Sequence, residues 1–277
     1  MNRRAAIAVA AALVAAAVIA YVGHRLWLKS DDLLQPVVVL RDGDAAALVQ
    51  PSLAQRIAAL QHPGAIPVGD RQRLIALTFD DGPYPVTTPL LLQTLADLHV
   101  PATFFLIGRD AELFPVLAQA IAAGGDEIAD HTMTHPNLDQ LDDAAVTGEL
   151  RAGAKTLETI APDPAEQALF RPPHGRYTLA TIHAAQAAGY ATILWNDDPG
   201  DWRSVSPATL LTHVLGHATA PEVLLLHSGK PGTIAMLPEL VARYRQAGYS
   251  FVTVGSLLRR ASATELNHPA KLPLAGS

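Results

Sequence analysis

The sequence predicts an α/β protein: a distorted (β/α) barrel of about seven strands, preceded by an N-terminal membrane helix. Short apolar runs alternate with longer helical stretches from residue 74 to residue 258, a pattern typical of parallel strands joined by helices. Gly189 and Gly248 stand directly before two of the apolar runs, which marks the turn from a helix into the next strand. The membrane helix is predicted from an uncharged apolar run near the N-terminus.

The expected elements follow one another in a regular order. The strand-like runs lie at residues 75–79, 102–107, 127–128, 190–195, 223–226 and 250–254. The helical stretches lie at residues 89–98, 112–123, 142–160, 179–188, 207–218 and 234–247. Six or seven such units in roughly 190 residues predict a barrel smaller than the eight-stranded kind, with its chemistry at the C-terminal ends of the strands.

The N-terminal run covers residues 5–22 and follows Arg3 and Arg4. As a helix it would be roughly 27 Å long at about 1.5 Å per residue, close to the thickness of a bilayer core. The arginines predict a cytoplasmic N-terminus and an exported body. A cleaved signal peptide is the alternative to an uncleaved anchor, since small residues follow at Val18-Ile-Ala20.

The chain therefore divides into four parts. Residues 1–28 form the anchor or signal segment, and residues 29–70, which prolines interrupt repeatedly, form a stalk or cap. Residues 71–258 are expected to form the α/β domain, and residues 259–277 a C-terminal tail. We expect the domain outside the cytoplasm, either membrane-anchored or, after cleavage, secreted.

The composition argues against a nucleic-acid site and excludes a metal site with cysteine ligands. The formal net charge is −6, whereas a nucleic-acid partner requires a basic face. The chain has no cysteine, so a metal ion could be held only by histidine, aspartate or glutamate side chains.

Two adjacent carboxylates end the first apolar run. Asp80 and Asp81 follow Phe79 directly, and Gly82 and Pro83 then turn the chain. Paired carboxylates at the end of a buried strand repel each other and lose hydration, and a bound cation would offset that cost. The alternative is an ordinary Asp-Gly-Pro turn with solvated acids. His227 also follows a strand-like run, so all three side chains are expected at the catalytic end of the barrel.

Histidines with a spacing of four residues supply candidate metal ligands. His131 and His135 lie in a polar loop after a short strand, and a helical turn would bring their rings together. With one aspartate they would form a three-ligand zinc site with an open position for water. His213 and His217 have the same spacing but lie in an ordinary amphipathic stretch, so we interpret them as surface or structural residues.

Five segments occur in order along the chain: Thr78-Phe-Asp-Asp-Gly-Pro83, His131-Thr-Met-Thr-His135, Arg171-Pro-Pro-His-Gly175, Asp198-Pro-Gly-Asp-Trp202 and Leu225-Leu-His227. Together they resemble the motifs of the NodB-homology polysaccharide deacetylases, carbohydrate esterase family 4, over residues 71–258. The third segment departs from the family pattern, because His174 stands where the family has tyrosine. The resemblance implies the NodB-homology fold, a distorted barrel of about seven strands.

The resemblance also implies roles for the first three segments. The family's metal ligands correspond to Asp81, His131 and His135, and the resemblance implies Zn²⁺ as the metal, with Co²⁺ as the alternative. Asp80 corresponds to the general base. Adjacent strand residues point to opposite faces, so Asp80 and Asp81 can share a site only if the backbone turns here, which Gly82 permits. Arg171 would favour the ionised form of Asp80.

The remaining roles concern the substrate and the leaving group. By resemblance, the backbone N–H of His174 stabilises the oxyanion together with the metal. His227 is the expected general acid that protonates the leaving amine, and Asp201 would orient it. Trp202 and Tyr177 could present aromatic faces to a sugar ring.

The expected activity is a metal-dependent N-deacetylase that acts on an N-acetylated glycan, with N-acetylglucosamine as the reacting unit and acetate as a product. Two other hydrolase activities are alternatives, an O-acetyl esterase of xylan and an amino-sugar deformylase, because both would use the same metal and base. A non-catalytic glycan-binding module is the alternative of another class. The expected partners are the glycan and a membrane, through residues 5–22.

Overall fold

The computed structural model describes residues 39–40, 73–160, 168–203 and 205–267. All of them belong to one compact unit, Pro36–Ser277. The predicted anchor at residues 5–22 and almost all of the predicted stalk lie outside the described residues and stay predictions. No helix within the described ranges has the length and apolar character that crossing a bilayer requires.

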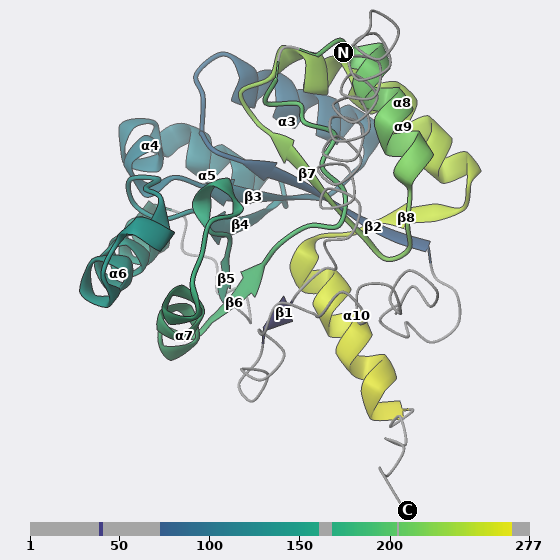
Figure 1. Cartoon of the computed structure of the whole chain (residues 1–277). Helices are drawn as coiled ribbons and strands as arrows, with labels where there is room; N and C mark the ends of the chain where they lie inside the picture. The colour runs from purple at the N-terminus through teal and green to yellow at the C-terminus, as the bar shows by residue number, and fades with distance from the viewer. Residues whose placement is uncertain (1–38, 41–72, 161–167, 204, 268–277) are drawn as a thin grey trace, which may run out of the picture. The chain divides into compact units, whose positions relative to one another are not determined.

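The described strands form one curled sheet (Figure 1). They are β1 (Val39–Leu40), β2 (Arg73–Asp80), β3 (Ala102–Leu106), β4 (Glu127–Asp130), β5 (Ala168–Phe170), β6 (Tyr190–Ile193), β7 (Glu222–His227) and β8 (Tyr249–Phe251). Their order is β1-β6-β5-β4-β3-β2-β7, and β8 pairs with the start of β2. All described pairings are parallel except that of β1 with β6.

The curl brings the two ends of the parallel array together. Asp197, just after β6, forms a parallel bridge with Leu224 of β7. The sheet is thus a curled half-barrel of parallel strands, which confirms the predicted α/β class. The sequence prediction missed β5, which has three residues and is too short to show a periodic pattern.

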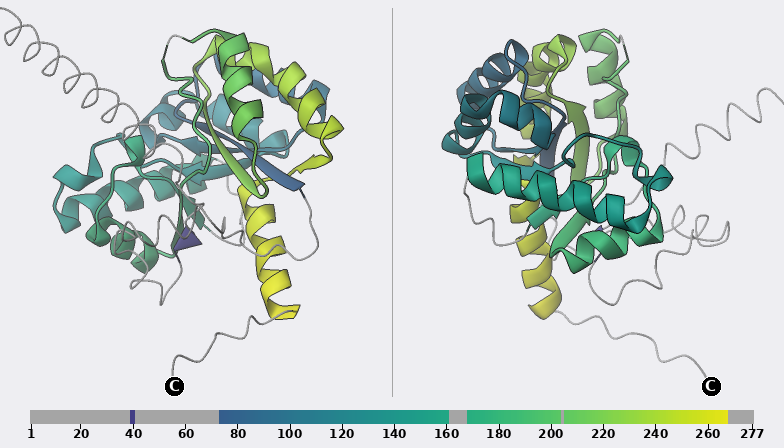
Figure 2. Two further views of the ribbon diagram at one scale, coloured as in Figure 1. Left: turned by 45° about the vertical axis from the view of Figure 1, so that its right-hand side comes forward. Right: turned by 90° about the vertical axis from the view of Figure 1, so that its left-hand side faces the viewer.

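Helices α3 to α9 lie outside the sheet between successive strands, and α10 follows the last strand (Figure 2). They are α3 (Thr87–Leu98), α4 (Gly108–Leu113), α5 (Pro115–Ala123), α6 (Asp143–Ile160), α7 (Leu179–Ala187), α8 (Pro207–His217), α9 (Pro231–Gln246) and α10 (Val254–Asn267). The single helix predicted for residues 112–123 is wrong: the chain forms α4 and α5, with a non-helical Phe114 before Pro115. The predicted tail also begins too early, since α10 continues through Asn267.

Alternation along β2 separates two apolar cores. Ile75, Leu77 and Phe79 pack outward against the helices, whereas Leu74 and Ala76 face the interior of the curl. The interior core also includes Val252, Val254, Leu257 and Leu258, so the start of α10 closes the end of the half-barrel at which β2 begins. The next inward positions of β2 are Thr78 and Asp80, and both side chains are buried. The interior therefore changes from apolar to polar toward the C-terminal ends of the strands.

Candidate active site

The two acids at the end of β2 share one site because the backbone turns at Asp81. Asp80 is the last strand residue and faces inward, and Asp81 then adopts a left-handed conformation with φ 69°. Gly82 continues the turn with φ 73°, and a Cβ there would lie 2.8 Å from the hydroxyl of Ser228. The sequence prediction assigned the turn to Gly82 alone. Aspartate, however, tolerates this region better than most residues.

His131 and His135 converge without the helical turn that their spacing suggested. They lie in the loop that follows β4, and both Thr132 and His135 have positive φ, 69° and 61°. Positive φ is a genuine outlier for the β-branched Thr132. Hydrogen bonds hold the turn: Asp130 Oδ1 accepts from the Thr132 N–H at 2.8 Å, and Thr132 Oγ1 accepts from the His135 N–H at 3.0 Å. The Asp130 side chain is buried, and it supports the loop from the interior of the protein.

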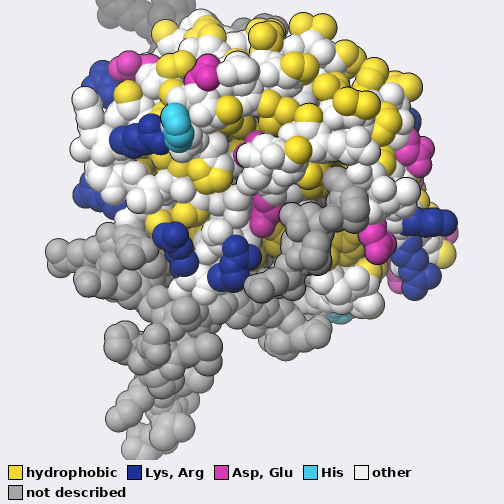
Figure 3. Space-filling model, turned by 180° about the vertical axis from the view of Figure 1, so that it is seen from behind, with side chains coloured by type: hydrophobic (Ala, Val, Ile, Leu, Met, Phe, Trp, Pro, Cys, Tyr) yellow, Lys and Arg dark blue, Asp and Glu magenta, His cyan; other side chains and the backbone are white. Residues whose placement is uncertain are grey.

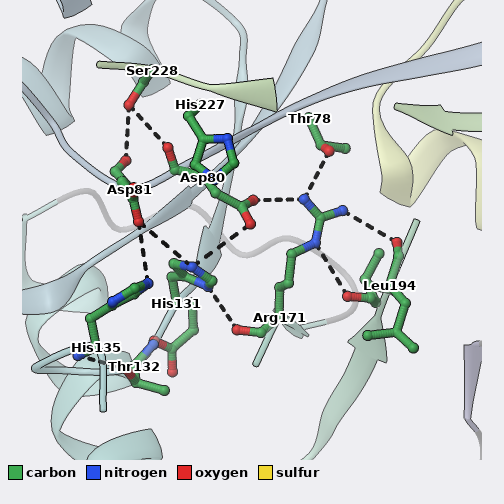
Figure 4. Close-up of polar contacts among 12 residues, drawn as sticks. Thr78, Asp80, Asp81, His131, Thr132, His135, Arg171, Leu194, His227 and Ser228 are labelled. Carbon is green, nitrogen blue, oxygen red and sulfur yellow. Dashed lines mark hydrogen bonds and ion pairs between the residues drawn. The ribbon is translucent and has the colours of Figure 1, made fainter. Parts of the chain in front are cut away.

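Asp81, His131 and His135 form the group among the described residues that could hold a metal ion, with donor atoms all within 4.8 Å of one another. Asp81 Oδ1 lies 3.3 Å from His135 Nε2 and 3.8 Å from His131 Nε2 (Figure 4). The Nδ1 of His131 is 2.8 Å from the carbonyl oxygen of Arg171, which leaves its Nε2 directed at the acids.

The protonation states of this group suit a metal ion. Burial lowers the pKa of His131 to about 3, and burial also lowers the pKa of His135. Both rings are therefore neutral near pH 7 and each offers a nitrogen lone pair. Two neutral imidazoles and one carboxylate fit a divalent metal that prefers nitrogen and oxygen ligands.

Asp80 pairs with a fully buried arginine. Nη1 of Arg171 donates to Asp80 Oδ1 at 2.6 Å and to Thr78 Oγ1 at 2.8 Å. The guanidinium also lies over the ring of Phe105, 4.0 Å from its centroid. Burial raises the pKa of Asp80 above its ordinary value, and Arg171 offsets only part of that increase. The expectation that Arg171 favours the ionised carboxylate is right in direction, but burial has the larger effect.

His227 is held by Asp201. Its Nδ1 lies 2.7 Å from Asp201 Oδ1, and its backbone N–H donates to Oδ2 at 2.8 Å. Thr233 Oγ1 also donates to Oδ2, at 2.6 Å, so the buried carboxylate has a partner on each oxygen. Burial lowers the pKa of His227, but the hydrogen bond to Asp201 and the charges of Asp80 and Asp81 raise it above its ordinary value overall. The Nε2 of His227 is left for the substrate side.

The three predicted substrate residues are placed on loops. His174 lies in the short 3-10 turn η3 (Pro173–Gly175) with φ 57°, and its ring centroid is 4.5 Å from that of His135. The backbone N–H of His174 has no acceptor among the described residues. Tyr177 follows η3 and Trp202 follows β6, and both side chains are exposed. Their contact with a sugar stays a prediction.

Two residues outside the predicted site residues support the loops of the site. Ser228 Oγ donates to the carbonyl oxygens of Asp80 and Asp81, at 3.2 and 3.1 Å, and so fastens the turn after β2 to the end of β7. Glu149 of α6 accepts from both the N–H and the hydroxyl of Thr134, each at 2.8 Å. Position next to a motif residue could have indicated Ser228, but nothing local points to Glu149.

His213 and His217 lie apart from this group, on α8. Their rings stack with centroids 4.2 Å apart, and His213 Nε2 lies 3.0 Å from Asp197 Oδ1. Asp197 belongs to the bridge between the end of β6 and β7. The pair thus has a structural contact, as the sequence interpretation proposed.

The fold and the site together define a class: a parallel α/β hydrolase with a metal-binding group and a paired histidine and aspartate at the strand ends. The sequence profile of the polysaccharide deacetylase family matches residues 68–193. A peptidoglycan-N-acetylglucosamine deacetylase of Bacillus cereus is 36% identical over 197 residues, covering 69% of this chain and 91% of the relative. A chitooligosaccharide deacetylase of Bradyrhizobium is 37% identical over 162 residues, covering 57% and 72%.

Solved structures agree with this assignment. The peptidoglycan deacetylase PdaC of Bacillus subtilis superposes with a TM-score of 0.65 and 28% identity, over 72% of this chain and 96% of that protein. The chain therefore belongs to the polysaccharide deacetylase family, carbohydrate esterase family 4.

Proposed function

We propose that this protein is a metal-dependent N-deacetylase that removes acetyl groups from N-acetylglucosamine units of a cell-envelope or extracellular glycan. The observation that carries the proposal is the placement of two proton-transfer groups beside one metal-binding group. Asp80 lies next to Asp81 and 3.7 Å from His131 Nε2, measured from its Oδ2, and His227 follows β7 with Asp201 behind it.

A bound divalent ion would supply positive charge that acidifies a water molecule and polarises the amide carbonyl. Asp80 accepts the proton that the attacking water loses. Burial raises the pKa of Asp80 toward neutral pH, and a carboxylate with a higher pKa is a stronger base. The pKa of His227 is also raised, which favours the protonated form that donates a proton to the departing nitrogen. Water and acetamide thus give acetate and a free amine on the sugar.

Two further groups serve the same reaction. The N–H of His174, which has no acceptor in the described part of the chain, can donate a hydrogen bond to the oxyanion that forms when water attacks the carbonyl. Arg171 holds Asp80 in place from the interior and is too deeply buried to contact a glycan.

Zn²⁺ is the proposed metal, with Co²⁺ as a functional substitute, since two imidazoles and one carboxylate are a common zinc ligand set. We also propose that the domain works outside the cytoplasm, anchored through residues 5–22 or secreted after cleavage. The support is the apolar run itself and the two arginines that precede it.

Acetate release tests the activity. We expect acetate from peptidoglycan, chitin oligomers or poly-N-acetylglucosamine, loss of release after chelation, and recovery with Zn²⁺ or Co²⁺. Asp80→Asn and His227→Ala should each abolish turnover while the protein still binds metal. Activity that persists after verified removal of the metal would refute the metal mechanism, and a near-normal rate in either variant would refute that residue's role.

The products released from different substrates distinguish the alternative functions. Release only from acetylxylan would identify an O-acetyl esterase, and formate in place of acetate would identify a deformylase. An ester places less demand on an acid than an amide does, because an alkoxide leaves more readily than an amide anion. A His227→Ala variant that cleaves esters but not amides would therefore support the esterase. Glycan binding without any release would identify a binding module.

A further inference from the structure

A second compartment adjoins the catalytic residues. A cavity of about 410 Å³ is formed by the loops that follow β2 and β7, and its lining includes Asp81, Tyr84, Val86, His227, Gly229 and Lys230. Clefts of this size accommodate small ligands. Basic and acidic side chains elsewhere occur in small scattered groups on the face shown in Figure 3.

The cavity lies on a different side of the site from His174. His174 contacts His135, and His135 contacts Asp81 from the loop after β4. The cavity is bounded by Asp81 and His227 but by neither of those other imidazoles. The reacting unit of a bound polymer would lie at the end of the cavity that Asp81 and His227 form, and an adjoining sugar would lie toward Tyr84 and Lys230.

The floor of the cavity is rigid. The ring of Tyr84 lies against the backbone of Gly229, where a Cβ would come within 2.7 Å of the ring. The Lys230 carbonyl accepts hydrogen bonds from the N–H groups of Thr233 and Ile234 and so begins α9. The backbone of Lys230 is thus fixed by the turn between β7 and α9, while its side chain lines the cavity.

The ammonium of Lys230 is the distinctive group of this compartment. Lys230 is partly buried, and its Nζ donates only to the carbonyl oxygen of Trp202, at 3.4 Å. It has no carboxylate within ion-pair distance among the described residues. Arg203 adds a second cation nearby, over the ring of Trp202 at 4.4 Å. Asp81 is the acid that lines the cavity, and its carboxylate is directed at His135 and the metal-binding group.

We propose that this cavity is a subsite for a neighbouring sugar that carries a carboxylate, with Lys230 as the residue that determines this specificity. The inference rests on the proposed deacetylase function and narrows its substrate to anionic N-acetylated glycans. The carboxylate could belong to a lactyl ether, as in muramic acid units that carry no peptide, or to a uronic acid. A neutral chitin-type chain leaves the ammonium without a partner.

The test compares kcat/KM for acetate release from three oligomers of equal length: N-acetylglucosamine alone, N-acetylglucosamine alternating with peptide-free N-acetylmuramic acid, and N-acetylglucosamine alternating with glucuronic acid. We expect the wild type to prefer at least one acidic oligomer, and the preferred one identifies the source of the carboxylate. Lys230→Met should lower the ratio of acidic to neutral kcat/KM roughly fivefold, as expected for one partly exposed ion pair. Lys230→Glu should lower it further, and Lys230→Arg should retain it.

Lys155→Met is the matched control, because it removes the same charge from an exposed position on α6. The wild-type ratio should also fall as salt concentration rises, whereas the ratio of Lys230→Met should change little. Equal ratios for the wild type and Lys230→Met, or a wild-type preference for the neutral oligomer at low salt, would overturn the inference and leave the proposed activity intact. No acetate from any oligomer would overturn the proposed function and this inference with it.

Discussion

Arg171 and Asp80 form a buried ion pair inside the curled sheet, with Nη1 and Oδ1 2.6 Å apart. Arg171 comes from the loop after β5, and Asp80 ends β2 on the other side of β3 and β4. The backbone carbonyls of Ile193 and Leu194 accept two further hydrogen bonds from the guanidinium, each at 3.3 Å. One side chain thus connects three strand ends and supports the proposed base.

Arg171→Met should be strongly destabilising, because it leaves the buried Asp80 carboxylate without its partner. The expected loss in the free energy of unfolding is about 3–5 kcal/mol, measured by urea denaturation. Asp80 accepts a proton only when ionised, so activity falls as pH drops through its pKa. Since Arg171 lowers that pKa, its removal should move the acidic limb of the pH–rate profile to higher pH.

The control for this variant is Arg176→Met, which removes an arginine from an exposed bidentate pair with Asp139. Solvent screens that pair, so its loss should have a much smaller effect on stability. Equal destabilisation by the two substitutions, or an unchanged acidic limb in Arg171→Met, would show that Arg171 does not act on Asp80.

Asp201→Asn should lower kcat and shift its alkaline limb. His227 donates a proton only when protonated, so activity falls as pH rises through its pKa. Asp201 contributes to raising that pKa, and the variant should therefore lose activity at lower pH than the wild type. Loss of a general acid costs roughly 10²- to 10⁴-fold in rate. Asp97→Asn is the control, because Asp97 is exposed on α3 and its carboxylate accepts from the side chain of Gln93. The same alkaline limb in wild type and Asp201→Asn would contradict the assignment.

Glu149→Gln should weaken metal binding although Glu149 is not a ligand. The carboxylate accepts two charge-assisted hydrogen bonds from Thr134. An amide can accept only one of them, and its NH₂ group can replace the other only by a weaker neutral bond to the Thr134 hydroxyl oxygen. The loop that carries His131 and His135 would then be less well fixed. The expected loss of affinity is roughly 10- to 100-fold, measured by competition with a chromophoric chelator and by the visible spectrum of the Co²⁺ form. Glu158→Gln, on the same helix, should bind metal as the wild type does.

Glu222 should make the folded state less stable at alkaline pH. Its side chain is fully buried and accepts from Tyr244 Oη at 2.7 Å, and burial raises its pKa from 4.5 to about 8. The folded state therefore holds a proton that the unfolded state releases above pH 4.5. The protonated Glu222 side chain therefore contributes its full stabilisation of the folded state below pH 4.5, and this stabilisation is lost as pH rises to about 8.

Glu222→Gln removes this dependence. An amide can accept from the Thr219 N–H with its oxygen and donate to Tyr244 Oη with its nitrogen. Urea midpoints at pH 5 and pH 8.5 should differ less for the variant than for the wild type. Glu239→Gln, an exposed site on α9, should retain the wild-type difference. A variant whose midpoints fall as much as those of the wild type would refute the proton on Glu222.

The site residues that the sequence could predict are those that stand at the ends of apolar, strand-like runs. Asp80 and Asp81 are adjacent at the end of an apolar run, and His227 ends another, so the parallel α/β class places all three at one end. The turn at Asp81 itself was not predictable, because its left-handed backbone is held by Ser228 from a distant strand. The convergence of His131 and His135 likewise depends on the loop geometry that Asp130 and Thr132 impose. The contact between Ser228 and Asp81 joins residues 147 positions apart. The contacts of Asp130 and Thr132 are local, but they hold positive φ angles at Thr132 and His135 that the four-residue spacing does not reveal.

The closure of the half-barrel by α10 determines how a polymer can reach the catalytic residues. Val254, Leu257 and Leu258 fill the interior at the end where β2 begins. A glycan chain therefore cannot pass through the half-barrel. We expect the proposed glycan substrate to lie instead across the other end of the half-barrel, where the strands end. Such sideways access requires no free chain end, so the proposed activity would extend to units in the middle of a long polymer.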